Sequence, residues 1–527
     1  MKTKEKETGG GATGKVNWGN ELLASVVVFL VALPLCMGIA IASNVPPALG
    51  LITGIVGGLV VGFLAGAPLQ VSGPAAGLAV LVYEYVTEFG VAALGFVVLA
   101  AGIFQLLFGA LKLGRWFRAV SPAVIQGMLA GIGALIFASQ FHVMVDDVPR
   151  ESGVRNYATL WESVQKGLLP MDGASHHLAA YIGVASILTI ILWNKFRPTA
   201  LKALPGPLLA VIVGTALAAI FKMDVVYVSI ESSLVGSLNF PDFSDVGVLG
   251  KMSFWGTALG FAIIASAETL LCATAVDRMH SGERTKYNKE LFAQGVGNVI
   301  CGIFGALPMT GVIVRSSANL EAGAKTRYSA IFHGAWLLIF VAFLPFVIQW
   351  IPRSVLAAIL VFTGYKLINP AAIKKLAAAG WMEVVIYLVT LVMIVCTNLL
   401  EGVLIGFGLA LLRLLFTFLR LEIVTNKSSD GQLVDIGFKG AATFVKLPKI
   451  AEILEGLDDE AEVHFHLGSL AYLDHAIIEL INDWEERRSG KVVMEMDSWK
   501  ERSKKGLVLP DVKMERASPG EPVSEGS

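Results

Sequence analysis

About fourteen apolar segments follow one another along most of this chain, and they limit what it can fold into. A helix that crosses a bilayer needs about 20 apolar residues, so a segment near this length predicts a transmembrane helix. Only 16% of the residues are charged, against about 25% in soluble domains. The sequence predicts a polytopic all-α membrane protein and argues against a large soluble enzyme. The predicted spans are residues 20–43, 47–66, 74–89, 91–110, 120–140, 178–194, 204–221, 254–277, 289–305, 311–323, 328–350, 354–368, 381–399 and 401–420.

Several functions have no support in the sequence. The net charge of −1 gives no excess of positive charge that would attract nucleic acid. The four cysteines lie in apolar segments without metal-ligand spacing, so we expect neither a metal nor a cofactor. No nucleotide-binding loop occurs that would support ATP-driven transport. The first apolar run leads directly into the next, which favours an uncleaved span after an N-terminal tail, residues 1–19.

The basic residues predict the orientation of the spans. They follow the even-numbered spans, and the positive-inside rule then places both termini in the cytoplasm of a multi-pass protein of the cell membrane. These residues are Lys112, Arg115, Arg118, Lys195, Arg197, Lys202, Arg278, Arg284, Lys286, Lys289, Lys325, Arg327, Lys366, Lys374 and Lys375.

The membrane part, residues 20–423, contains an internal repeat. Residues 20–221 and 252–420 would form two halves of seven spans each, and an odd number requires the halves to be inverted. Glycine and proline interruptions at matching places in two halves are a sequence signal for a transporter site in mid-membrane. The matching residues are Gly57, Gly62 and Pro68 in the first half and Gly297, Gly302 and Pro308 in the second.

Arg315 lies in a stretch that is apolar enough to be buried in a membrane, at the start of the short tenth span that Gly311 opens. A charge at this depth is costly and is usually functional. Together with the free N–H groups of a helix N-terminus, an arginine predicts an anion site. We expect the N–H groups of Ile313 and Val314 to contribute. The alternative is a structural arginine paired with Glu268.

The matching register of the repeat places Ala75 opposite Arg315, where Gly73 and Pro74 open the short third span. This predicts a second half-length helix whose N-terminus, near Ala75 and Ala76, faces the same anion.

Glu268 lies in the middle of the eighth span. A carboxylate in mid-membrane can take up and release a proton, and it can also help to bind a sodium ion. We predict that Glu268 binds the coupling ion. The alternative is a fixed ion pair with Arg315 that only holds helices together.

The composition changes after the last span. Residues 424–506 predict a small α/β domain with strands at 433–438, 442–447, 463–467 and 491–496 and a helix at 476–488. We expect residues 507–527 to form a disordered tail.

At these residues the chain resembles the SulP (sulfate permease) family of anion transporters. The likeness covers about residues 20–420, and the C-terminal part is similar to a short version of the family's STAS domain. The resemblance rests on the motifs ALPLCMGIA (32–40), VSGPA (71–75), AETLL (267–271), NKELFAQGVGN (288–298) and RSSANLEAGAKTR (315–327).

The resemblance implies a seven-plus-seven inverted repeat with core and gate domains, elevator-type transport and a homodimer. It places an anion between the third and tenth spans, facing the first and eighth. The resulting substrate-binding residues are Arg315, Val314, Ile313, Gly311, Ala75, Ala76 and Cys36. Family members carry sulfate, bicarbonate, dicarboxylates or chloride, and similarity to members linked to carbonic anhydrases keeps an association with such an enzyme open.

Some residues depart from the family pattern. Leu35 follows the first-span proline where the family often has glutamine. Sodium-coupled bicarbonate members carry aspartate, with threonine four residues later, where this chain has Glu268 and Cys272. A thiol is a poor sodium ligand, so we favour proton coupling. His475 replaces the residue that some STAS domains phosphorylate.

The sequence therefore favours a proton-coupled secondary transporter of sulfate or bicarbonate. Open alternatives are a sodium-coupled bicarbonate transporter or a dicarboxylate transporter, a nucleobase–cation symporter, an anion channel and a non-transporting membrane scaffold.

Overall fold

The structure, a computed structural model, describes residues 17–494 apart from 115–120, 151, 169–175, 199–200, 202–203, 230–235, 237, 242–246, 248 and 429–431. Most of the predicted N-terminal tail and the whole predicted C-terminal tail lie outside the described residues. The chain divides into two compact units, Met1–Phe407 and Gly408–Ser527.

Each half of the membrane part supplies seven spans, and two spans are short helices preceded by a strand. The first half contains α1 (Trp18–Ala42), α2 (Pro47–Val56), the π-helical turn η1 (Gly57–Val61), α3 (Gly62–Leu64), β1 (Ser72–Pro74), the short turn η2 (Ala76–Leu78), α4 (Ala79–Phe89), α5 (Leu94–Ala110), α6 (Pro122–Met144), α7 (Gly153–Ala158), α8 (Leu160–Leu168), α9 (His176–Phe196) and α10 (Gly206–Ile220). The second half contains α11 (Met252–Met279), α12 (Tyr287–Ile303), β2 (Met309–Gly311), α13 (Ile313–Glu321), α14 (Tyr328–Phe343), α15 (Pro345–Ile348), α16 (Arg353–Ile368), α17 (Pro370–Ala379), α18 (Trp381–Cys396) and α19 (Leu399–Leu419).

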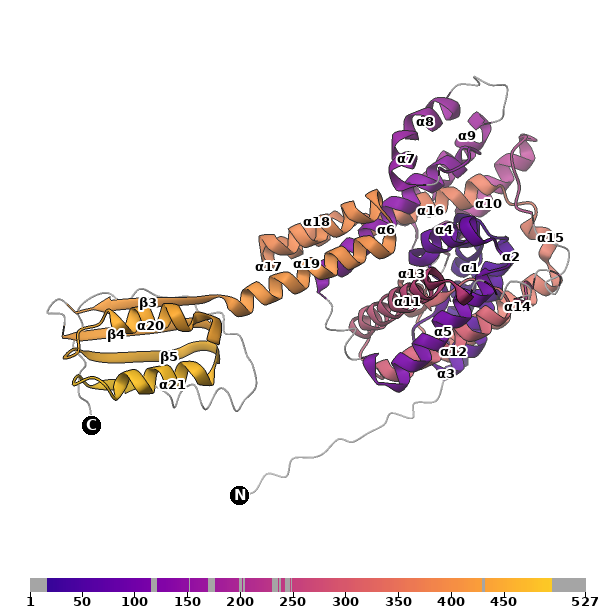
Figure 1. The fold of residues 1–527 in the computed structure, drawn as a ribbon. Helices are drawn as coiled ribbons and strands as arrows, with labels where there is room; N and C mark the ends of the chain where they lie inside the picture. Colours follow the sequence, from indigo (N-terminus) through magenta and orange to yellow (C-terminus); the bar gives the residue numbers. More distant parts are fainter. Residues whose placement is uncertain are drawn as a thin grey trace. The chain divides into compact units, whose positions relative to one another are not determined.

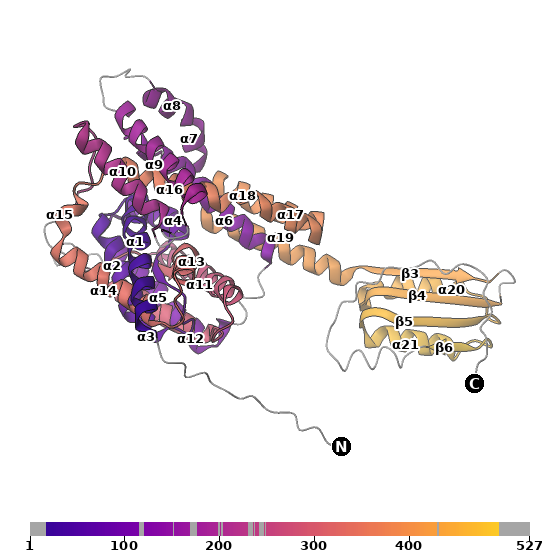
Figure 2. The same cartoon turned by 180° about the vertical axis from the view of Figure 1, so that it is seen from behind.

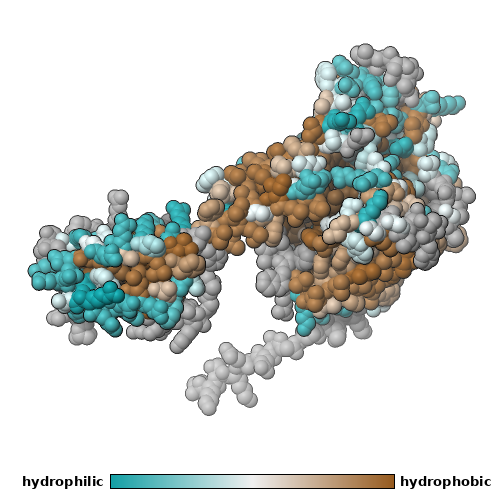
Figure 3. Space-filling view, viewed as in Figure 1, coloured by the Kyte–Doolittle hydropathy of each residue, from teal (hydrophilic) through white to brown (hydrophobic). Residues whose placement is uncertain are grey.

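The predicted spans are confirmed as helices. Among the described residues, seven apolar helical segments reach at least 18 residues, and four further apolar helices are shorter. The three remaining predicted spans correspond to α12, α4 and α13. Figure 3 shows the hydrophobic surface that these helices present. The fold is a polytopic membrane protein with a seven-plus-seven inverted repeat.

The helices pack into a core group and a gate group. In the core, α1 packs against α2, α13 and α14, and α5 packs against α11 and α12. In the gate, α6 contacts α16 and α18, and α9 contacts α10 and α16 (Figures 1 and 2). Helix α1 also touches α10 and α16. Each group mixes helices from both halves of the chain, as an inverted repeat requires.

The strands β1 and β2 form a buried antiparallel ribbon inside the core group. Ser72 pairs with Gly311, and Pro74 pairs with Met309. One more backbone hydrogen bond extends the ribbon: the Val312 N–H donates to the Val71 carbonyl at 2.9 Å. Irregular backbone at membrane depth is tolerated only where protein satisfies its polar groups. The ribbon satisfies these groups and lets two helices begin inside the membrane.

A hydrogen-bonded carboxylate fastens the gate segment α8 to the end of α6. Asp147 accepts hydrogen bonds from Lys166 Nζ at 3.0 Å and Ser163 Oγ at 3.1 Å, and it lies 3.2 Å from His142 Nδ1. Burial opposes the ionisation of Asp147, but the hydrogen bonds from Lys166, His142 and the Val148 N–H outweigh it and lower its pKa to about 2.

The second unit contains the α/β domain. Its elements are β3 (Leu421–Lys427), β4 (Leu433–Ala442), the short turn η6 (Phe444–Lys446), α20 (Leu447–Glu455), β5 (Glu462–Leu473), α21 (His475–Glu485) and β6 (Val492–Met494). The sheet order is β3-β4-β5-β6, with β3 antiparallel to β4 and the other neighbours parallel. Ile436, Phe465 and Ile477 are buried in its core.

The strands at 433–438 and 463–467 are confirmed but run on to Ala442 and Leu473, the helix at 476–488 is confirmed within a few residues, and β6 lies within the predicted 491–496 segment. The strand predicted at 442–447 is wrong, because β4 ends at Ala442 and Pro448 lies in the first turn of α20, where proline is favoured. The strand β3 was missed, because it follows directly on α19.

We expect Gly57→Ala to destabilise the core by about 1–3 kcal/mol, the cost of overpacking a filled site. A methyl group at Gly57 would lie 2.5 Å from the Ser72 carbonyl oxygen, and ribbon pairing holds Ser72 in place. The thermal unfolding midpoint in detergent should fall. Gly256→Ala on α11 is the matched control, since a methyl group there meets no atom within 4 Å. Equal midpoints for both variants would contradict this packing.

We expect Asp147→Asn to lower the local stability of α8 by about 1 kcal/mol at neutral pH, because Lys166, a partner of the carboxylate, is partly exposed to solvent. The pKa of Asp147 is lowered in the folded state from an ordinary value of 3.8 to about 2. Its stabilisation is therefore present above the ordinary value and is lost as the pH falls between these two values. Amide hydrogen exchange of residues 160–168 checks this. Glu162→Gln, with a largely exposed carboxylate, is the control, and similar exchange in both variants would count against the role of Asp147.

Candidate functional site

Two half-length helices begin beside the buried ribbon. β1 leads through η2 into α4, and β2 leads into α13. Each strand pairs only three residues in antiparallel register. The two exits from the ribbon, at Pro74 and Gly311, lie on neighbouring strands two residues out of register and are therefore ~8 Å apart. The structure thus brings Ala75 and Ala76 close to the start of α13.

Neither helix start is capped by a side chain. Ala75 precedes η2 and Val312 precedes α13, and neither makes a side-chain capping hydrogen bond. The first intrahelical hydrogen bond of α13 runs from the Ser316 N–H to the Val312 carbonyl. The N–H groups of Ile313 and Val314 precede this bond and have no intrahelical partner. Two uncapped helix starts in mid-membrane form an attractive site for an anion.

The accessible surface of the site is apolar. Val314 is 46% exposed although it begins a helix inside the core group. Ile313 and Ala76 are half-buried, and Ala75 is buried. Backbone N–H groups, rather than side chains, are therefore the polar groups that this surface offers to a ligand.

Arg315 is fully buried and lies on the side of the ribbon that faces α1 and α14. A methyl group at Gly73 would lie 2.0 Å from Arg315 Nη1, so only glycine lets the guanidinium approach the ribbon. Among the described residues, no carboxylate pairs with its guanidinium, and the Cys36 thiol lies within its reach. Its charge interacts electrostatically with Cys36 of α1 and His333 of α14. No carboxylate of the described residues therefore neutralises this cation.

The fixed ion pair between Arg315 and Glu268 is not formed in the structure, which leaves both groups free for other roles. Glu268, on α11, faces the other half-helix: a methyl group at Gly77 would lie 2.7 Å from Glu268 Oε2. The Gly77 N–H and the Thr310 hydroxyl face its carboxylate as hydrogen-bond donors. The side chain is half-buried, and its Oε2 atom has no hydrogen-bond partner among the described residues.

Two other predicted residues occupy less accessible positions. Cys36 is fully buried, and its Sγ atom would lie 2.7 Å from a methyl group on Gly54. It lies beside Arg315 rather than at the helix starts. Gly311 belongs to the ribbon, and its N–H donates to Thr269 Oγ1 at 3.1 Å. Its backbone donor is therefore already used.

A row of polar residues on α12, which sequence reasoning missed, supports the ribbon. The Asn298 side chain donates to the Met309 carbonyl at 3.1 Å and accepts from the Met309 N–H at 2.7 Å. The Gln294 amide donates to Ser72 Oγ at 2.6 Å. Glu290 accepts from the Gln294 amide at 2.9 Å and from two backbone N–H groups that precede β1. The spacing of four residues, which places side chains on one helix face, was the signal available in the sequence.

The chain matches the model of the sulfate permease family over residues 19–390. The putative sulfate transporter YvdB of Bacillus subtilis is 29% identical over 395 residues, which cover 74% of this chain and 72% of that protein. The bicarbonate transporter BicA of Picosynechococcus sp. is 26% identical over 391 residues, which cover 69% of this chain and 64% of that protein.

Two solved structures share the fold. The transmembrane domain of a cyanobacterium bicarbonate transporter BicA matches with a TM-score of 0.63 at 22% identity, covering 75% of this chain and 97% of that chain. The murine Slc26a9 anion transporter in the inward-facing state matches with a TM-score of 0.74 at 15% identity, covering 93% of this chain and 88% of that chain.

We expect Arg315→Gln to weaken anion binding roughly thirtyfold. A buried cation about 8 Å from an anion contributes about 2 kcal/mol at an effective dielectric of about 20. The measurement is the rise of the thermal unfolding midpoint with anion concentration. Lys374→Gln, an exposed charge on α17, is the control that removes the same charge. An unchanged anion response in Arg315→Gln would remove this residue from the site.

Proposed function

Since the chain belongs to the sulfate permease family, we propose that it carries sulfate or bicarbonate across the membrane as a secondary transporter. The protein is a multi-pass membrane anion transporter and not an enzyme. Relatives of the chain include a putative sulfate transporter and a bicarbonate transporter. Both anions carry oxygen atoms that accept hydrogen bonds from backbone N–H groups.

One observation carries the proposal: a buried and unneutralised Arg315 lies beside two uncapped helix starts. An uncompensated buried charge is costly to keep, and an anion between the helix starts would offset that cost. The backbone donors near Ala75 and Ile313 would hold the anion. Arg315 would attract the anion electrostatically from its buried position, where its guanidinium lies against Gly73 of the ribbon.

We propose Glu268 as the residue that binds the coupling ion, with a proton as the first candidate. Its half-buried carboxylate faces Gly77, at the start of the half-helix pair, and no cationic side chain pairs with it among the described residues. Protonation would remove a negative charge close to the proposed anion. Uptake of a proton and an anion would then favour each other.

A specific observation supports sodium as the second candidate. The Thr310 hydroxyl faces the Glu268 carboxylate. A carboxylate and a hydroxyl are hard oxygen ligands that suit such a cation. Cys272 is directed elsewhere, because its Sγ atom lies 3.6 Å from Ser316 Oγ.

The core group would move against the gate group in an elevator-type cycle, because the half-helices, the ribbon and Glu268 all belong to the core elements. The same proposal includes a homodimer, both termini in the cytoplasm, a STAS-like role for the α/β domain and an association with carbonic anhydrase. These features are implied by the family resemblance.

The experiment is uptake of labelled sulfate and of labelled bicarbonate into proteoliposomes, with an inward proton gradient or an inward sodium gradient as separate arms. We expect the proton gradient to drive uptake in the wild type. Glu268→Gln should remove this drive and flatten the pH profile, while exchange of anion for anion persists. Glu88→Gln, an exposed carboxylate at the end of α4, is the control.

An unchanged pH profile in Glu268→Gln would refute the coupling role. If a sodium gradient drives uptake in the wild type and Glu268→Gln abolishes this effect, sodium and not the proton is the coupling ion. Conductance far above carrier turnover would indicate a channel, and the absence of any anion flux would leave the scaffold alternative.

A further inference from the structure

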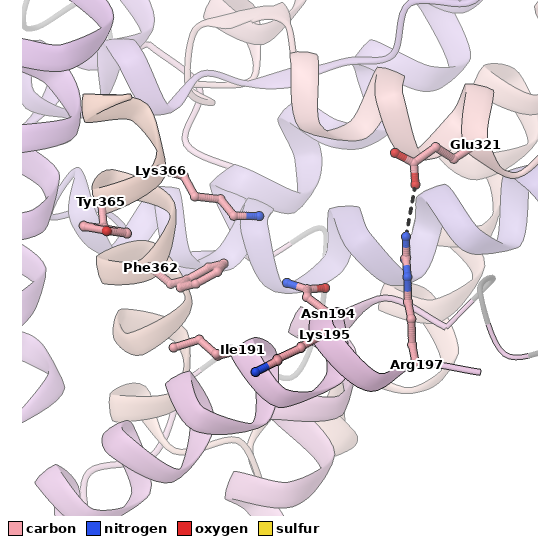
Figure 4. A pocket seen from close by; sticks show the side chains of 8 residues that line it. All are labelled: Ile191, Asn194, Lys195, Arg197, Glu321, Phe362, Tyr365 and Lys366. Carbon is pink, nitrogen blue, oxygen red and sulfur yellow. Dashed lines mark ion pairs between the residues drawn. The ribbon is translucent and has the colours of Figure 1, made fainter. Parts of the chain in front are cut away.

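A cleft of about 620 Å³ lies where α9 and α16 of the gate meet the end of α13 of the core (Figure 4). Its lining differs from that of the anion site, because long charged side chains and aromatic rings dominate it. The residues that matter here are Lys195, Arg197, Glu321, Phe362, Tyr365 and Lys366.

The cleft has more positive than negative charge. Arg197 forms an ion pair with Glu321 at 3.8 Å, and Figure 4 shows this pair at one end of the cleft. Lys195 and Lys366 have no carboxylate partner among the described residues. Each instead lies over a neighbouring ring, Phe196 at 5.2 Å and Phe362 at 4.8 Å. Three cations and one carboxylate leave an excess of two positive charges for a bound anion.

The cleft also lies at the end of two spans. Helix α9 ends at Phe196 and α16 ends at Ile368. Large apolar side chains near these ends are exposed: Leu192 is 52%, Phe196 is 67% and Tyr365 is 64% exposed. Aromatic residues and lysines at the ends of spans are typical of the lipid headgroup region. The cleft therefore offers charge to a headgroup next to an apolar surface for acyl chains.

We propose that this cleft binds the phosphate group of an anionic phospholipid. Lys195 and Lys366 would contact the phosphate, and the acyl chains would lie along Leu192 and its neighbours on α9. Basic pockets between transmembrane helices are suited to lipid headgroups. A free phosphate ion shares the headgroup chemistry but has no apolar part to fill the exposed face of α9.

The geometry gives Glu321 a competing role. It already holds Arg197 at the edge of the cleft, so a lipid phosphate must share this guanidinium with a carboxylate. Removal of the carboxylate charge should therefore strengthen lipid binding, whereas removal of the two lysines should weaken it. These opposite directions distinguish a specific site from general attraction to a charged bilayer.

The test uses the purified full-length protein and native mass spectrometry with mixtures of phosphatidylglycerol and phosphatidylcholine. We expect the wild type to retain phosphatidylglycerol preferentially. The Lys195→Gln/Lys366→Gln variant should lose at least about tenfold of this preference, since each lysine near the headgroup contributes about 1 kcal/mol. Lys374→Gln/Lys375→Gln, with the same charge change on α17, should keep it, and Glu321→Gln should increase it.

Thermal unfolding of each variant confirms that it is folded. An equal lipid preference in the two double-lysine variants would overturn the site. A second arm measures thermal unfolding with inorganic phosphate alone. If phosphate raises the unfolding midpoint as much as phosphatidylglycerol does, the cleft takes a soluble anion, and the lipid assignment is overturned. Because the readout is lipid binding and not uptake, failure here would leave the transport proposal standing.

Discussion

The structure depends on how it satisfies backbone polar groups in the middle of a membrane. Hydrocarbon offers no hydrogen bonds, so each interrupted span must find partners within the protein. Here the two interruptions satisfy each other as the β1–β2 ribbon. Asn298 of α12 hydrogen-bonds the backbone of Met309, and Thr269 of α11 accepts from the Gly311 N–H. The N–H groups of Ile313 and Val314 precede the first hydrogen bond of α13 and remain without an intrahelical partner.

The two charged side chains near the two helix starts, Arg315 and Glu268, contact different helices. Arg315 extends past Gly73 toward α1 and α14, and Glu268 faces Gly77 and the gate helix α6, where Ile132 approaches the same glycine. Arg315 and Glu268 lie against different glycines of the chain and form no ion pair with each other. A site between them can hold an anion on the side of the helix starts and a small cation at the carboxylate. The ribbon therefore determines where the site lies.

Much of this was predictable from sequence, because hydropathy and the cost of buried charge act locally. The spans and the half-helices follow from these rules, and so do the proposals for Arg315 and Glu268. The direction in which Arg315 points was not predictable, since it depends on the space that Gly73 leaves. The α12 row was missed because Glu290 and Asn298 lie within a motif that was interpreted only as family likeness. The segment 442–447 was misassigned because a short apolar run suits a strand and a helix equally.

Helix α13 connects the anion site to the lipid cleft. Its nine residues span about 14 Å at 1.5 Å per residue, with the free N–H groups at one end and Glu321 at the other. A carboxylate at a helix C-terminus opposes the helix dipole, and the ion pair with Arg197 of the gate offsets this repulsion. A lipid phosphate that engaged Arg197 would weaken that offset and with it one contact between core and gate. The same short helix would then transmit the lipid environment to the element that holds the anion.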